Sequence, residues 1–320
     1  MQEKKIPSLS DIREAHHRIE NMIHRTPVLT SRSMNKLTGS DLYFKCENFQ
    51  RSGAFKFLGA CNAITQLLAN KQVKIVATHS SGNHAGALAL AANLHKLQCI
   101  VVMPSNSSKI KINAVREYGA KIIFCLPTLQ SRESELERVQ EQTGASFIHP
   151  YNNFDVIAGQ GTAALEFIRD CNELDCLIAP VGGGGLLSGT AIAAKSIKPE
   201  ITVFGAEPKG ADDAWRSFKE KRIVPSVNPK TIADGLLTSL SDRTFAAITA
   251  FADDILTVSE EGIVLAMQLL QERMKIVVEP SGCVPLAAVL ENKPIFNNRK
   301  TGIILSGGNI DPEIASGIHT

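Results

Sequence analysis

Short aliphatic runs alternate along the chain with segments whose apolar residues recur at helical spacing. The runs contain Val and Ile without polar alternation, which is typical of strands covered on both faces of a sheet. They predict strands at 42–47, 74–80, 99–104, 121–127, 177–181, 201–207, 255–259 and 302–308. The helical spacing predicts a first helix capped by Ser8 or Ser10 and ended by Thr26-Pro27, then helices at 55–69, 82–96, 107–119, 131–144, 157–170, 186–196 and 261–274. This alternation predicts an α/β fold with mostly parallel sheet.

Glycine and small polar residues follow three of the predicted strands. These stretches are Ser80-Ser81-Gly82-Asn83-His84, Gly182 to Gly185, and Ser306-Gly307-Gly308-Asn309. Ligands of parallel α/β sheets bind beyond the carboxyl ends of the strands. Unpaired N–H groups at a helix start suit a carboxylate or a phosphate. The three strand ends therefore favour one shared ligand cleft, although a serine cap with a glycine turn stays an alternative for the first.

The four consecutive glycines have a rival interpretation as a dinucleotide-binding turn. They follow a strand and open a helix, and the acidic Glu207 ends the next strand. In the spaced glycine pattern of such turns, Gly183 and Gly185 fit the first two positions. Ser188 stands at the third position, where glycine or alanine is expected. The lysine and hydroxyl residue of a P-loop are absent after the glycines, which excludes that type of nucleotide site.

Lys56 lies at the start of an apolar helix between Phe55 and Phe57. A helix N-terminus and partial desolvation both disfavour an ammonium group. The neutral amine that remains is the form a lysine needs for bonding to a carbonyl carbon. A surface lysine that extends its amine into water is the alternative.

Composition narrows the function classes. The 320 residues include 34 Lys+Arg and 32 Asp+Glu, giving a net charge of +2, and hydrophobic residues make up 44 %. The balance argues against a nucleic-acid partner, and the apolar content excludes disorder. No apolar stretch reaches the ~20 residues of a membrane span. Seven cysteines without a CxxC pair and a polar N-terminus indicate buried free thiols in a cytoplasmic protein.

Taken together, these segments give the chain a family resemblance. It resembles the fold-type II pyridoxal-phosphate (PLP) enzymes, within them the serine racemase and serine/threonine dehydratase family, and most of all the eukaryotic-type serine racemases. The shared motifs are TPVLTS (26–31), FKCENFQRSGAFKF (44–57), SSGNHA (80–85), AGQGT (158–162), GGGGLLSG (182–189), AEP (206–208), IADG (232–235), ERMKIVVEPSG (272–282) and SGGN (306–309). The resemblance implies a tryptophan synthase β-like fold of two open, twisted, mostly parallel sheets. It also implies a large PLP-binding domain (1–68 and 153–320), a small mobile domain (69–152) and the cofactor between them.

The resemblance also implies residue roles. Lys56 matches the lysine that binds PLP covalently and moves a proton on one face of the substrate Cα. The cofactor-binding matches are Phe55, Lys56, Asn83, Gly182, Gly183, Gly184, Gly185, Leu186 and Ser306, with Asn83 at the phenolic oxygen, the glycines at the phosphate and Ser306 at the ring nitrogen. The substrate-binding matches are Ser80, Ser81, Gly82, Asn83, His84 and Arg132. Glu207, Ala211 and Asp213 match a divalent-cation site for Mg, Ca or Mn.

The family contains both racemases and dehydratases. Ser81 matches the serine that carries a proton on the opposite face of Cα in racemases, where threonine dehydratases typically have alanine. Hydroxyaspartate dehydratases also carry SSGNH, and Arg132 could receive a second carboxylate or be a solvated helix charge. We therefore expect serine racemisation together with β-elimination to pyruvate and ammonia. The alternative is a hydroxyaspartate, serine or threonine dehydratase with little racemase activity, and a more distant one is the dinucleotide-binding protein.

Two positions depart from the family pattern. Leu58 replaces a common arginine, which predicts the loss of an ion pair, and Tyr151 stands where animal serine racemases often have asparagine. Serine as a small substrate, a homodimer and ATP as an effector are further expectations from the resemblance, with no ATP motif found in the chain.

Overall fold

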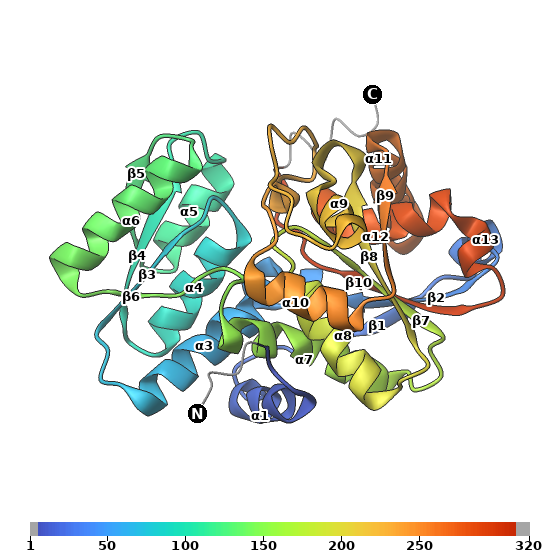
Figure 1. The fold of residues 1–320 in the computed structure, drawn as a ribbon, viewed down its shortest axis with the longest axis horizontal. Helices are drawn as coiled ribbons and strands as arrows, with labels where there is room; N and C mark the ends of the chain where they lie inside the picture. The colour runs from blue at the N-terminus through green and yellow to red at the C-terminus, as the bar shows by residue number, and fades with distance from the viewer. Residues whose placement is uncertain (1–5, 312–320) are drawn as a thin grey trace.

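The computed structural model describes residues 6–311, which form two β-sheets with flanking helices (Figure 1). The larger sheet has the strand order β1-β2-β10-β7-β8-β9, and the smaller has the order β5-β4-β3-β6. Only the β1–β2 pair is antiparallel among the described strands. The predicted α/β class with two mostly parallel sheets is therefore confirmed.

The larger sheet is assembled from both ends of the chain. Its strands are β1 (Val28–Thr30), β2 (Asp41–Cys46), β7 (Cys176–Pro180), β8 (Thr202–Pro208), β9 (Asp254–Val258) and β10 (Lys300–Leu305). The last strand, β10, lies between β2 and β7. Its central position brings the segment after Leu305 beside the segment that follows β2.

The smaller sheet comes from one continuous stretch. Its strands are β3 (Ile75–His79), β4 (Gln98–Pro104), β5 (Lys121–Cys125) and β6 (Ser146–Phe147). The helices α4 (Asn83–Leu94), α5 (Lys109–Glu117) and α6 (Leu129–Thr143) connect these strands and lie with them on the left of Figure 1. The remaining helices are α1 (Leu9–Ile19), α2 (Arg32–Thr38), α3 (Lys56–Asn70), α7 (Phe154–Asp170), α8 (Gly185–Ile197), α9 (Asp213–Glu220), α10 (Asp242–Phe251), α11 (Glu260–Leu269), α12 (Pro280–Glu291) and α13 (Lys293–Phe296).

Glycines allow α7 to approach α3 and α8 closely. A Cβ atom on Gly159 would lie 2.5 Å from the carbonyl oxygen of Leu58 in α3. A Cβ on Gly189 of α8 would lie 2.5 Å from the backbone nitrogen of Gly161. Because backbones can come this close only where side chains are missing, the AGQGT motif sets the spacing of α3 and α8. The N-termini of these two helices carry Lys56 and the glycine loop.

The hydrophobic pattern predicted most elements to within a few residues, with some errors at their ends. The first helix ends at Ile19, and a turn separates it from Thr26, where its end was expected. The predicted helix 261–274 is α-helical only to Leu269 and continues as a π-helical turn to Met274, which Lys275 ends in the left-handed conformation. The predicted final strand ends at Leu305.

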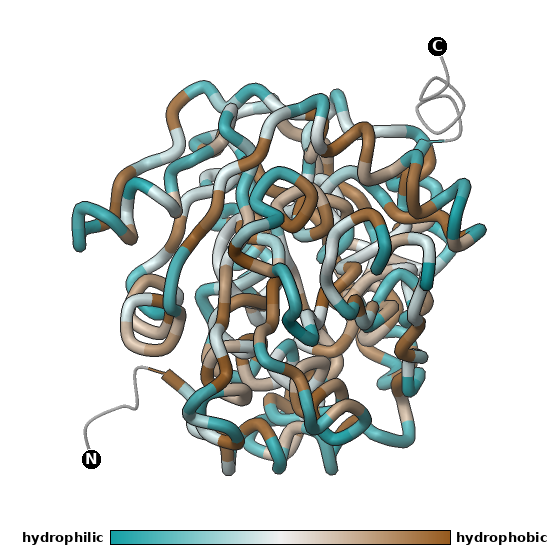
Figure 2. Tube along the Cα trace, turned by 90° about the vertical axis from the view of Figure 1, so that its right-hand side faces the viewer, coloured by the Kyte–Doolittle hydropathy of each residue, from teal (hydrophilic) through white to brown (hydrophobic). Residues whose placement is uncertain are grey.

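Several elements lie in stretches for which the pattern made no prediction, and these are β1, β6, α2, α9, α10, α12 and α13. The two short strands carry too few residues for a period. Figure 2 shows brown and pale stretches of the chain running through the interior and teal stretches at many of the outer bends. Within residues 6–311 we find no helix that is long and apolar enough to cross a membrane.

Candidate active site

The predicted cofactor and substrate residues line one cavity of about 1040 Å³, measured with its open mouth. Its lining residues are Phe55, Lys56, His79, Ser80, Ser81, Gly82, Asn83, His84, Lys111, Leu129, Arg132, Pro150, Tyr151, Pro180, Gly182, Gly183, Gly184, Gly185, Leu186, Asp234, Gly235, Leu236, Thr238, Glu279, Ser281 and Ser306. The prediction of one shared cleft beyond the strand ends is consistent with this geometry, because the starts of α3, α4 and α8 all meet there.

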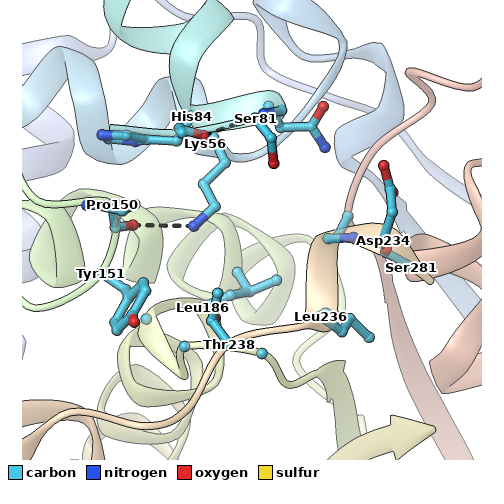
Figure 3. Close-up of a pocket in the computed structure, with 18 of the residues that line it drawn as sticks. Lys56, Ser81, His84, Pro150, Tyr151, Leu186, Asp234, Leu236, Thr238 and Ser281 are labelled. Atoms are coloured by element: carbon cyan, nitrogen blue, oxygen red, sulfur yellow. Dashed lines mark hydrogen bonds between the residues drawn. The ribbon is translucent and has the colours of Figure 1, made fainter. Parts of the chain in front are cut away.

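Lys56 begins α3 and extends into the cavity between two walls (Figure 3). Its Nζ donates a hydrogen bond to the carbonyl oxygen of Pro150 over 3.0 Å. Burial lowers the pKa of Lys56 to about 8, because the charged form loses solvation there. A larger share of the amine is therefore neutral at physiological pH than for a surface lysine. The alternative of a solvated surface lysine does not describe this side chain.

Backbone contacts attach the lysine to the end of β10. The N–H of Phe55 donates to the carbonyl oxygen of Ser306 over 3.0 Å, and Ala54 forms an isolated antiparallel bridge with Gly307. Ser306 is 2 % exposed and lines the cavity. These contacts keep the residue that carries the reactive amine and the predicted ring-nitrogen partner in one rigid unit.

The glycine loop turns from β7 into α8 with little space around it. Gly184 has a φ of +84°, a conformation that glycine adopts readily. A Cβ on Gly183 would lie 2.3 Å from the ring of Tyr151, and one on Gly185 would lie 2.4 Å from Oε1 of Gln160. The first N–H groups of α8 have no partner within their own helix. These N–H groups could receive an anionic group of a ligand.

The start of α4 is a second candidate position for an anionic group. Gly82 is its N-cap residue and has no side chain to satisfy the first N–H groups of the helix. Ser81 is exposed, whereas His84 is buried with its Nε2 3.1 Å from the carbonyl oxygen of Ile148. A carbonyl only accepts, so Nε2 carries the proton, and burial lowers the pKa of His84 well below its usual value. A substrate carboxylate would therefore meet the backbone N–H groups of this loop. The buried His84 ring beside them is neutral.

A column of rings begins and ends at two residues of the cavity lining, His79 and Tyr151, and Arg132 lines the same cavity. His79, Phe147, His149 and Tyr151 follow one another with ring centroids 5.6, 5.4 and 4.6 Å apart. Burial lowers the pKa of His79 to about 4 and that of His149 to about 3, so both rings are neutral near pH 7. The Nε of Arg132 and Nδ1 of His79 are buried and have no hydrogen-bond partner among the described residues. These groups can receive an additional acceptor group from a ligand.

Sequence reasoning assigned no role to several residues that line the cavity. Lys111 of α5 forms an ion pair with Asp234 across the cavity mouth. Glu279 and Thr238 also line the cavity. Of these residues, only Glu279 is unusual for its place in the sequence. It directly precedes Pro280 at a helix N-cap, where Ser, Thr, Asp and Asn are the usual residues.

The three residues predicted to bind a cation lie outside this cavity, where β8 leads into α9. Glu207 accepts hydrogen bonds from the N–H groups of Ala214 and Trp215 over 3.1 and 2.9 Å. Both oxygens of Asp213 are buried and make no hydrogen bond of normal geometry to the described residues. Burial and the neighbouring Asp213 raise the pKa of Glu207, and burial raises that of Asp213 to about 6. The described residues contain no group of three or more His, Cys, Asp or Glu side chains suited to a metal, so a cation would need the Ala211 carbonyl or water as well.

The residues of the cavity fit pyridoxal phosphate. A lysine with a lowered pKa can bind its carbonyl carbon, and a glycine-lined helix start can hold its phosphate. The neutral hydroxyl of Ser306 can face a ring nitrogen at the other end.

Comparison with known proteins agrees with this chemistry. The model of the family described as "Pyridoxal-phosphate dependent enzyme" matches residues 19–307. The chain is 50 % identical to a serine racemase of Dictyostelium discoideum, with 95 % of both chains covered, and 48 % identical to a beta-hydroxyaspartate dehydratase of Paracoccus denitrificans, covering 96 % and 97 %. The structure of maize serine racemase superimposes with a TM-score of 0.94 at 44 % identity, covering 98 % of this chain and 97 % of that one. This chain belongs to the pyridoxal-phosphate dependent enzymes of fold type II.

Proposed function

We propose that this protein is a serine racemase that also converts serine to pyruvate and ammonia by β-elimination. The observation that carries the proposal is that Lys56 and Ser81 line the same cavity, together with the glycine loop at the start of α8. Racemisation by two bases needs one proton carrier on each face of Cα, and these residues are the candidates. Relatives named as serine racemases, at 50 % and 48 % identity, support the same activity.

Each residue has a distinct task in this proposal. Bound pyridoxal phosphate withdraws electrons from the substrate and so acidifies its Cα proton. Lys56 would hold the cofactor and move the proton at one face of Cα, and Ser81 would move it at the other. Gly182 to Leu186 would hold the phosphate, Phe55 and Asn83 would flank the ring, and Ser306 would face the ring nitrogen. The backbone from Ser80 to His84 would bind the substrate carboxylate.

The geometry separates racemisation from elimination. Loss of the β-hydroxyl requires Cα deprotonation by Lys56 but no proton return from the opposite face. Ser81 is exposed, and within residues 6–311 it makes no hydrogen bond to a basic side chain that would activate it. Its contribution to racemisation therefore depends on activation by bound ligand groups. Both reactions should share the same lysine and differ in their need for Ser81.

A second candidate is a dehydratase acting on L-threo-3-hydroxyaspartate, L-serine or L-threonine with little racemase activity. Arg132 favours it, since its buried Nε lacks a partner among the described residues and could bind a second carboxylate. The Paracoccus relative named as a beta-hydroxyaspartate dehydratase supports this alternative.

One experiment distinguishes the candidates. L-serine and L-threo-3-hydroxyaspartate are incubated separately with the purified protein, and D-serine, pyruvate and oxaloacetate are quantified. The racemase proposal expects D-serine and pyruvate from L-serine. Oxaloacetate formation without D-serine would reject it in favour of the dehydratase.

We further propose that residues 69–152 form a small mobile domain and that 1–68 and 153–320 form the large cofactor-binding domain. The continuous origin of the smaller sheet supports this division. Small-angle scattering with and without serine would test the movement.

Several further properties belong to the same proposal. Glu207, Asp213 and the Ala211 carbonyl would hold a divalent cation (Mg, Ca or Mn), supported by the buried oxygens of Asp213. A homodimer is supported by the exposed apolar side chains of Phe49 and Val277. Free cysteines throughout the described chain support a cytoplasmic location. ATP as an effector rests on the family resemblance alone, and added ATP in the serine assay would test it.

A further inference from the structure

The carboxamide of Asn83 is held from two sides at the start of α4. Its Nδ2 donates to Oε1 of Glu279 over 2.6 Å, and its Oδ1 accepts from Nδ2 of Asn309 over 2.9 Å. Glu279 precedes α12, and Asn309 follows β10. Two segments far away in the sequence therefore contact one side chain that lines the cavity.

The orientation of this amide follows from the groups at the two ends of the network. Asn309 also donates from Nδ2 to the backbone carbonyl oxygen of Ser52 over 2.7 Å. A carbonyl can only accept, so the amino group of Asn309 must point toward Ser52 and its second N–H serves Asn83. An ionised Glu279 can likewise only accept. Both ends thus require the same orientation, in which Asn83 keeps one N–H for another partner.

Glu279 is not needed by its own helix. It is the N-cap residue of α12 but makes no side-chain capping bond. Its carboxyl is 2 % exposed, and Oε2 has no hydrogen-bond partner among the described residues. Burial raises the pKa of Glu279 to about 7, while Lys111 lowers it and Asp234 raises it. A buried carboxyl with a single close donor lowers the stability of the fold. Its hydrogen bond to Asn83 explains why a carboxyl stands at this position.

The surrounding backbone makes room for the network. A Cβ on Gly307 would lie 2.4 Å from Oε1 of Glu279, and one on Gly53 would lie 2.3 Å from Oδ1 of Asn309. Ser52 has a φ of 58°, an uncommon conformation for a residue with a side chain. The hydrogen bond from Asn309 reaches the carbonyl of this residue, four positions before Lys56.

We infer that Glu279 and Asn309 are positioning residues that make Asn83 present a hydrogen-bond donor, and not an acceptor, to the cavity. The inference rests on the proposed function, in which Asn83 meets the phenolic oxygen of pyridoxal phosphate. That oxygen accepts a hydrogen bond, so a reversed amide would face it with a second acceptor. The Asn309 anchor sets the orientation at any pH, because the Ser52 carbonyl only accepts, and the Glu279 anchor sets it when the carboxyl is ionised. Above the pKa of Glu279 either anchor is therefore enough.

The test is a double-mutant cycle on the binding of pyridoxal phosphate. Glu279→Gln can accept or donate, Asn309→Ala removes the second anchor, and the combined variant frees the amide to rotate. Cofactor dissociation constants come from equilibrium dialysis, and the visible absorbance maximum of the bound cofactor gives a spectroscopic signature. Asn83→Ala is the reference for complete loss of the donor. Glu47→Gln is the matched control, because Glu47 is another buried carboxyl and does not line the cavity.

At a pH of about 8.5, where Glu279 is mostly ionised, each single variant should raise the dissociation constant less than about twofold and leave the absorbance maximum unchanged. The combined variant should raise it about tenfold or more, the cost of one hydrogen bond to a charged group, and move the maximum toward that of Asn83→Ala. If the combined variant does not fold, Glu279→Gln with Asn309→Ser replaces it. Additive effects, an unshifted maximum, or an equal effect of Glu47→Gln would overturn the inference. A wild-type protein without any visible band would instead reject the proposed function and this inference with it.

Discussion

The lowered pKa of Lys56 predicts how cofactor binding depends on pH. At pH 7 about a tenth of an amine with a pKa of about 8 is neutral, against about one part in 3000 at the ordinary value of 10.5. From pH 7 to pH 9 the neutral share rises about tenfold and then levels off. With the ordinary pKa it would rise about a hundredfold without levelling. Since the neutral amine attacks the cofactor carbonyl, the rate of reconstitution should follow the first curve.

The assay mixes cofactor-free protein with pyridoxal phosphate and records the growth of visible absorbance between pH 6.5 and 9.5. A model amine in the same buffers corrects for the titration of the cofactor itself. Lys56→Ala measures the slow reaction with surface lysines and should show no stable band. A rate that still climbs tenfold for each pH unit at pH 9 would refute the argument that burial lowers this pKa.

Three further outcomes are expected. Ser81→Ala should reduce D-serine formation by about 100-fold or more and pyruvate formation much less; an equal loss of both would reject the opposite-face proton role. Gly183→Ala should destabilise the protein by about 1–3 kcal/mol in thermal unfolding, because its Cβ would lie 2.3 Å from the Tyr151 ring, and an unchanged Tm would contradict this packing. Saturating Ca²⁺ should raise Tm by about 5 °C or more in the wild type and not in Asp213→Asn, and equal shifts would exclude Asp213 as a ligand.

The departure at Leu58 shows where sequence reasoning stopped short. The family pattern predicted the loss of an ion pair at this position. In the structure Leu58 is 1 % exposed and packs in the cluster that includes Phe57 and Val156. Apolar burial thus takes the place of charge at this position. The replacement is visible in the sequence, but its compensation depends on the contact between α3 and α7.

Local signals predicted the elements whose stability is local. Ser8 caps α1 with a complete capping box, as its side chain accepts from the N–H of Asp11 and the Asp11 carboxylate accepts from Ser8. Strands buried on both faces are apolar throughout, so their pattern is unambiguous. The π-helical turn after Leu269 and the short strands β1 and β6 escaped prediction, since tertiary pairing and not local period stabilises them.

The sequence by itself determined the alternation of strands and helices, the glycines at close backbone approaches and the candidate reactive lysine. It determined them because period, helix caps and glycine conformation are properties of neighbouring residues. Only the tertiary structure decided that β10 inserts between β2 and β7, which places Ser306 beside Phe55 and Asn309 beside Asn83. The tertiary structure also decided the pKa of Lys56 and the role of Glu279. Desolvation and hydrogen-bond partners arise from segments that meet only when the chain folds.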